Sequence, residues 1–121
     1  MKQKQVGGSH YINLKMQPVQ LFAETRCTPF QANVIKYLVR YKDKNGLEDL
    51  QKASHYASLA KELNCLGNLT QAARNRFKFF CKENSLPEEQ SRIIACISND
   101  LYDRAIIYIK QLAWEQYKKA I

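Results

Sequence analysis

The sequence lacks the glycine-rich loops with which P-loop and Rossmann proteins hold phosphate groups. It contains four glycines in 121 residues, and neither G-x-x-x-x-G-K-[ST] nor G-x-G-x-x-G occurs anywhere in it. The chain therefore belongs to neither of these classes of nucleotide-binding protein.

The sequence also lacks the closely spaced cysteine pairs of structural zinc sites. Its four cysteines (Cys27, Cys65, Cys81 and Cys96) are far apart, and its two histidines do not complete a zinc-ligand pattern with them. No metal bound by the protein itself is expected, and Cys81 and Cys96 are interpreted as small core residues because they fall within apolar helical patterns.

No apolar run approaches the roughly 20 residues of a membrane-spanning helix, and no N-terminal segment resembles a signal peptide. These two absences predict a cytoplasmic protein without a membrane partner.

What the chain does have is positive charge. Its net charge is +8 and its pI is about 9.4. The excess of Lys and Arg is spread over both halves of the chain, so neither half is a basic tail. This balance favours an anionic partner, either a nucleotide, a nucleic acid or an acidic protein.

Apolar residues recur with helical spacing, and no stretch has a convincing strand pattern. We predict a small all-α domain of about five helices, with an extended N-terminal arm and a central helix hairpin. Residues 1–63 hold the arm and the hairpin, and residues 64–121 form a helical C-terminal part of the same globular unit. The last helix, about 101–119, is apolar nearly all round, which indicates packing on two sides and hence a homo-oligomer.

The first helix of the predicted hairpin has one polar and one apolar face. With 3.6 residues per turn, the polar face carries Asn33, Lys36, Tyr37 and Arg40. The opposite, buried face carries Val34, Ile35, Leu38 and Tyr41.

A turn then leads into the second helix of the hairpin. Asn45 of the turn Asp43-Lys44-Asn45-Gly46 is expected to cap this helix, with Glu48 three residues later. Asp49, Lys52 and Tyr56 form a second polar stripe. Both helices thus present cations and a tyrosine on an ordered face, which suits a ligand that carries phosphate.

Fixed intervals over about fifty residues carry a family resemblance. GGSHY at Gly7–Tyr11, NVIKYLVRYKDKNGLEDLQKA at Asn33–Ala53, and Tyr56 together resemble a family of small domains common in bacteriophage genomes. The family was long classed as a domain of unknown function and includes nucleotide kinases of the phage T-seven type, which have no P-loop. The resemblance covers about the first half of the chain.

The resemblance implies a nucleotide site in the cytoplasm of an infected bacterial host, with Mg²⁺ arriving together with the nucleotide. Lys36 and Arg40 are expected to bind phosphates, and Asp49 to hold Mg²⁺ or to orient the attacking oxygen. These three are the candidate catalytic residues. The other candidates would bind the base or the phosphates: Ser9, His10, Tyr11, Asn33, Tyr37, Lys44, Asn45, Gly46, Lys52 and Tyr56.

Each candidate also has a purely structural interpretation. Lys36 and Arg40 could belong to a solvated helix face, and the two tyrosines could be core-edge residues. Asp49 could be a first-turn acid favoured by the helix dipole, or an ion-pair partner of Lys52 or Arg40.

Three functions follow from these readings. The first is a nucleoside monophosphate kinase, with sites between the subunits of an oligomer. The second is a non-catalytic sponge that sequesters a nucleotide signal of host immunity. The third is a nucleic-acid-binding module, which only the charge supports and which ranks last because no recognition helix is apparent.

Overall fold

The computed structural model describes residues 14–121, and the regular secondary structure of this part of the chain consists of helices without strands. Its elements are α1 (Pro18–Thr25), α2 (Pro29–Arg40), the 3₁₀ turn η1 (Tyr41–Asp43), α3 (Leu47–Glu62), α4 (Gln71–Glu83), α5 (Glu88–Ser98) and α6 (Tyr102–Tyr117). The predicted all-α fold is confirmed, with six α-helices where about five were expected. The predicted N-terminal arm lies outside the described residues.

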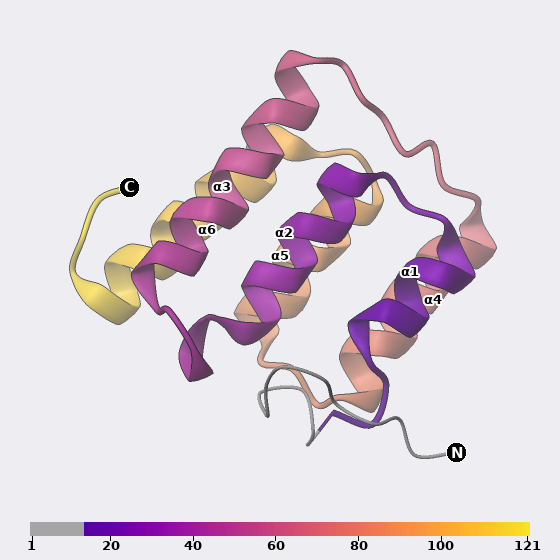
Figure 1. Cartoon of the computed structure of the whole chain (residues 1–121), viewed down its shortest axis with the longest axis horizontal. Coiled ribbons are helices and arrows are strands. Elements are labelled where there is room, and N and C mark those ends of the chain that lie inside the picture. Colours follow the sequence, from indigo (N-terminus) through magenta and orange to yellow (C-terminus); the bar gives the residue numbers. More distant parts are fainter. Residues whose placement is uncertain (1–13) are drawn as a thin grey trace.

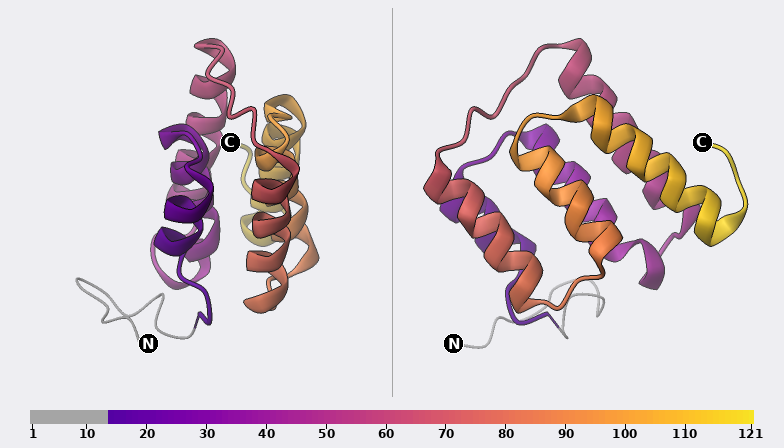
Figure 2. Two further views of the ribbon diagram at one scale, coloured as in Figure 1. Left: turned by 90° about the vertical axis from the view of Figure 1, so that its right-hand side faces the viewer. Right: turned by 180° about the vertical axis from the view of Figure 1, so that it is seen from behind.

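The helices form two layers. Helices α1, α2 and α3 lie side by side in one layer, and α4, α5 and α6 form the other (Figure 1). Turned by 90°, the molecule shows the two layers face to face (Figure 2), with α1 against α4, α2 against α5 and α3 against α6. The chain passes between the layers through residues 63–70. None of the helices in the described part is long and apolar enough to cross a membrane.

Two helix starts were predictable from local sequence. The Thr28 hydroxyl accepts a hydrogen bond from Gln31 N (3.1 Å), and Gln31 Oε1 accepts one from Thr28 N (2.9 Å). This reciprocal capping box, followed by Pro29 in the first helical position, begins α2. Thr70 begins α4 with a simpler cap, in which its hydroxyl accepts a hydrogen bond from Ala73 N at 3.1 Å.

Two other sequence patterns typical of a helix start, S-x-x-E at Ser85 and the Asn99-Asp100 pair, do not begin helices. Helix α5 begins after Pro87 rather than in an S-x-x-E box at Ser85, and α6 begins after Leu101 rather than at Asn99 or Asp100. Ser85 and Asp100 have φ values of 50° and 59° and therefore belong to the left-handed links that follow the preceding helices.

The core lies between the layers and follows the predicted helix faces. All four residues expected on the buried face of α2 (Val34, Ile35, Leu38 and Tyr41) are fully buried. Along α6, Ala105, Ile109 and Leu112 recur with helical spacing and are buried, while Ile107 and Trp114 are each 55% exposed. This helix therefore keeps an apolar outer face, as its sequence indicated.

Asp100 fastens the loop between the layers. Its Oδ1 accepts hydrogen bonds from Gly67 N (2.8 Å), Tyr102 Oη (2.9 Å) and Gln31 Nε2 (3.3 Å), and its Oδ2 accepts one from Asn68 N (3.0 Å). Gly67 approaches the buried Gln31 amide so closely that a Cβ at this position would overlap it. One carboxylate thus joins α2, the loop and α6.

Tyr41 predicts a stability change in alkali. Its side chain is fully buried, its hydroxyl has no hydrogen-bond partner in the described part of the chain, and burial raises its pKa from 10.0 to about 12, with smaller contributions from Tyr117 and Glu89. Because Tyr41 loses its proton more easily in the unfolded chain than in the folded one, its contribution to stability is complete below pH 10. This contribution is lost progressively as the pH rises from 10 to about 12. We expect Tyr41 to account for a loss of about 1.4 kcal/mol in the free energy of unfolding between pH 9 and 11.

Urea denaturation at the two pH values measures this loss, and Tyr41→Phe is the matched control. The variant should retain its stability at pH 9 and lose less of it at pH 11 than the parent chain. The same pH dependence in both proteins would contradict the assignment to Tyr41.

Candidate functional site

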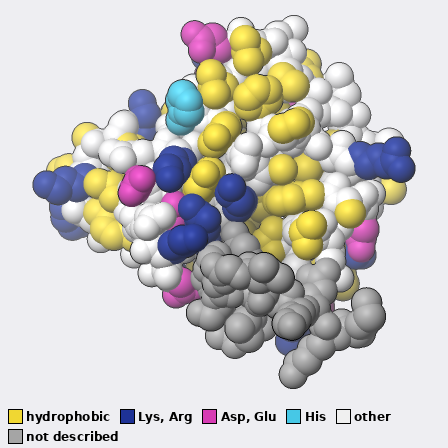
Figure 3. Space-filling model, in the orientation of Figure 1, with side chains coloured by type: hydrophobic (Ala, Val, Ile, Leu, Met, Phe, Trp, Pro, Cys, Tyr) yellow, Lys and Arg dark blue, Asp and Glu magenta, His cyan; other side chains and the backbone are white. Residues whose placement is uncertain are grey.

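The polar stripes of α2 and α3 lie side by side and form one face. At its centre the rings of Tyr37 and Tyr56 stack, with centroids 5.9 Å apart and planes inclined by 7°. Lys and Arg side chains gather over these two helices in the space-filling view (Figure 3). The structure therefore brings together the two tyrosines that the sequence placed on separate stripes.

Three cations surround the ring of Tyr37. Lys36 Nζ and Arg40 Cζ each lie 4.6 Å from its centroid, and Lys52 Nζ lies 5.4 Å away. The aromatic face attracts all three, but they repel one another at this spacing. Lys52 also contacts Glu48, with Nζ and Oε1 3.4 Å apart. A bound anion would offset the remaining repulsion.

Arg40 is held in place by Asp49. Its Nη2 donates to Asp49 Oδ1 at 3.2 Å, and Asn45 N donates to Asp49 Oδ2 at the same distance. The Asp49 side chain is fully buried and that of Arg40 is 12% exposed. Asp49 lies in the first turn of α3, where the helix dipole favours a negative charge. Of the structural interpretations of Asp49 that the sequence left open, this geometry matches an ion-pair partner of Arg40.

The turn beside this pair is shaped by glycine. Gly46, not Asn45, is the N-cap residue of α3, and its φ of 56° and ψ of −121° suit glycine. A Cβ at Gly46 would lie 3.1 Å from Tyr117 Oη, so the end of α6 packs directly against the turn. Tyr117 thus supports the candidate site from the second layer.

The structure therefore assembles six of the predicted site residues into one cluster, which we call the tyrosine–cation face: Lys36, Tyr37, Arg40, Asp49, Lys52 and Tyr56. Asn33 lies one turn before Lys36 on α2 and is half-buried, while Lys44 and Asn45 are exposed in the adjoining turn with Gly46. The candidates Ser9, His10 and Tyr11 lie outside the described residues.

His55 adds an imidazole to the edge of this face. It was not among the candidate site residues, and it is exposed. Its ring nevertheless meets Tyr56 edge-on, with centroids 5.7 Å apart and planes inclined by 61°. Its position directly before Tyr56 was the available signal.

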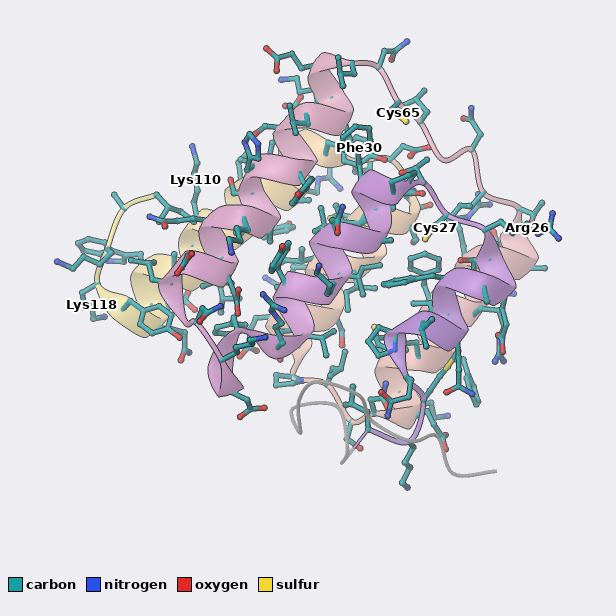
Figure 4. The ribbon with its side chains drawn as sticks, viewed as in Figure 1. Arg26, Cys27, Phe30, Cys65, Lys110 and Lys118 are labelled. Carbon is teal, nitrogen blue, oxygen red and sulfur yellow. The ribbon has the colours of Figure 1, made fainter. Side chains whose placement is uncertain are left out.

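No preformed metal cluster accompanies this face. Among residues 14–121, no three or more His, Cys, Asp and Glu side chains come close enough together to hold one ion. The four cysteines are free thiols. Cys27 follows α1 and Cys65 lies in the loop between the layers, well apart in Figure 4.

Comparison with known proteins finds a partial match to one family, which has no assigned activity. Residues 6–58 match the model of a family described as a protein of unknown function, DUF3310. The matched segment includes α1, α2 and most of α3, and therefore the whole tyrosine–cation face. No curated protein and no solved structure matches the chain.

Proposed function

We propose that the tyrosine–cation face binds the phosphates of a nucleotide, and that the protein is a bacteriophage nucleoside monophosphate kinase. The observation that carries this proposal is the gathering of Lys36, Arg40 and Lys52 within 5.4 Å of the ring centroid of Tyr37. Phosphoryl transfer requires mainly positioning and neutralisation of charge, which such a cluster supplies without a P-loop.

Each residue has a role in this proposal. Lys36 and Lys52 bind phosphate oxygens as point charges, and Arg40 binds them through the part of its guanidinium that Asp49 leaves unoccupied. Tyr56 offers a ring on which a base can stack. With 5.9 Å between their centroids, the two tyrosine rings leave too little room for a base, since stacked rings need about 3.5 Å each. Mg²⁺ would arrive with the nucleoside triphosphate.

A kinase must hold two nucleotides, which is demanding for a small chain. We therefore propose a homo-oligomer in which a second subunit completes the site. The 55% exposed side chains of Ile107 and Trp114 on α6 supply an apolar surface for this contact.

Asp49 favours a second candidate function, a sponge that sequesters a host nucleotide signal without turnover. Both carboxylate oxygens of this buried residue already accept hydrogen bonds, from Arg40 and from the Asn45 amide. Asp49 can therefore hold Mg²⁺ only if Arg40 moves away. A sponge needs the cations and the rings but no such movement.

Incubation with nucleoside mono- and triphosphates and cyclic nucleotides, with and without Mg²⁺, distinguishes these functions. Mass spectrometry would follow both the solution and the material released from the denatured protein. For a kinase we expect new diphosphate, formed about 10- to 100-fold more slowly by Lys36→Gln and by Lys52→Gln, because each loses a charge-assisted contact.

Lys110→Gln is the matched control, since this exposed lysine lies on α6, away from the face (Figure 4). A nucleotide recovered unchanged, with no product, would favour the sponge. Binding only to long DNA or RNA, with steep salt dependence, would instead indicate the nucleic-acid module. Absence of both binding and turnover would overturn the nucleotide proposals.

A further inference from the structure

The second layer contains a groove that the tyrosine–cation face does not use. It lies between α4 and α5, has a volume of about 350 Å³ and opens to the surface. Its apolar lining residues include Phe77, Cys81, Leu86 and Ile94. Its volume falls within the roughly 300–1,000 Å³ of small-molecule sites, which are likewise mainly apolar with a few polar groups.

The charged side chains that line this groove are all positive. Lys78 and Lys82 line it from α4, one helical turn apart, and both are exposed. None of the residues that line the groove is acidic, and in residues 14–121 neither lysine forms a salt bridge. By contrast, Arg76 on the same helix is paired with Glu24, with Nε and Oε2 2.7 Å apart.

We propose that this groove binds an anionic amphiphile, a molecule with a single unbranched hydrocarbon chain and a carboxylate head. The chain lies against Phe77, Leu86 and Ile94, where its removal from water drives binding. The head lies over Lys78 and Lys82, whose charges it complements. The groove is in the opposite layer from the tyrosine–cation face, so binding of this ligand does not depend on the proposed kinase activity.

Calorimetric titration of the full chain with dodecanoate, below its micelle concentration, tests the proposal. We expect saturable binding that neither acetate, which has only the head, nor octyl glucoside, which has an uncharged head, reproduces at the same concentrations. Bound dodecanoate should also slow alkylation of Cys81, which lines the groove, and leave that of Cys65 unchanged, as mapped by mass spectrometry.

Two variants distinguish the contribution of the ligand's hydrocarbon chain from that of its carboxylate head. Ala95 lines the groove and is exposed, so Ala95→Phe should fill the cavity and abolish binding without disturbing the core. Ala72→Phe, at an exposed position of α4 that does not line the groove, is its control. The double variant Lys78→Gln/Lys82→Gln should weaken binding at least about tenfold through loss of charge-assisted contacts.

Lys110 and Lys118 provide the matched charge control. They lie on α6 and at its end, far from α4 (Figure 4), so Lys110→Gln/Lys118→Gln should bind dodecanoate like the parent chain. Absence of dodecanoate binding would overturn the proposal. So would binding that survives Ala95→Phe, or binding that both lysine pairs weaken equally.

Discussion

Replacement of Arg40 by alanine is expected to lower the free energy of unfolding by about 3–5 kcal/mol. The Asp49 carboxylate is fully buried and would lose its charged partner, and a buried charge left unpaired typically costs this much. The Asn45 amide would remain as a single donor to it. Chemical denaturation of Arg40→Ala and the parent chain measures the difference.

The double variant Arg40→Leu/Asp49→Leu separates stability from binding. Replacing both partners of a buried ion pair by apolar residues is often neutral or stabilising, so this variant should regain most of the lost stability. It should still fail to bind a nucleotide, because the guanidinium is absent. A loss below about 1 kcal/mol in Arg40→Ala would contradict this account of the pair.

Replacement of Asp100 by alanine is expected to cost about 3–4 kcal/mol. The Asp100 carboxylate accepts hydrogen bonds from Gly67, Asn68, Gln31 and Tyr102. A bond to a charged group contributes about 1.5–3 kcal/mol, and because Asp100 is partly exposed and water can replace its lost bonds, the net loss from all four should be about that of one such bond. Alanine would also have to adopt a φ of 59°, which costs about a further 1–2 kcal/mol. Denaturation measures the total loss, and amide hydrogen exchange at Gly67 and Asn68 should accelerate selectively.

Two controls locate the effect in the carboxylate. Asp100→Asn keeps an oxygen acceptor and tolerates the left-handed backbone, so its loss should be smaller than that of alanine. Asp103→Ala removes a neighbouring acid whose side chain is 72% exposed, and its stability should stay within about 0.5 kcal/mol of the parent value. Equal losses in Asp100→Ala and Asp103→Ala would show that the loop bonds contribute little.

Features that depend on neighbouring residues were predictable from sequence. Thr28-Pro29 and Thr70 mark the starts of α2 and α4, because a capping hydroxyl acts within three residues of itself. Helical periodicity placed Val34, Ile35 and Leu38 in the core and the Lys36–Arg40 stripe on the face.

Features that depend on distant residues were not predictable. Asp100 appeared to be a helix cap, but it accepts from Gly67 and Asn68, more than thirty positions away. The contact between Gly46 and Tyr117 joins residues 71 positions apart in the sequence. No local pattern encodes such partners, because they meet only when the two layers pack.

The order of the two layers also has a consequence for synthesis of the chain. On the ribosome, α1, α2 and α3 emerge before any helix of the second layer, and α6, which covers α3, emerges last. Until then the apolar faces of the first three helices have no layer to cover them, and surface exposed in this way favours aggregation. The core therefore stays incomplete until α6 has been synthesised, and a chain that stops before α6 should be prone to aggregation and degradation.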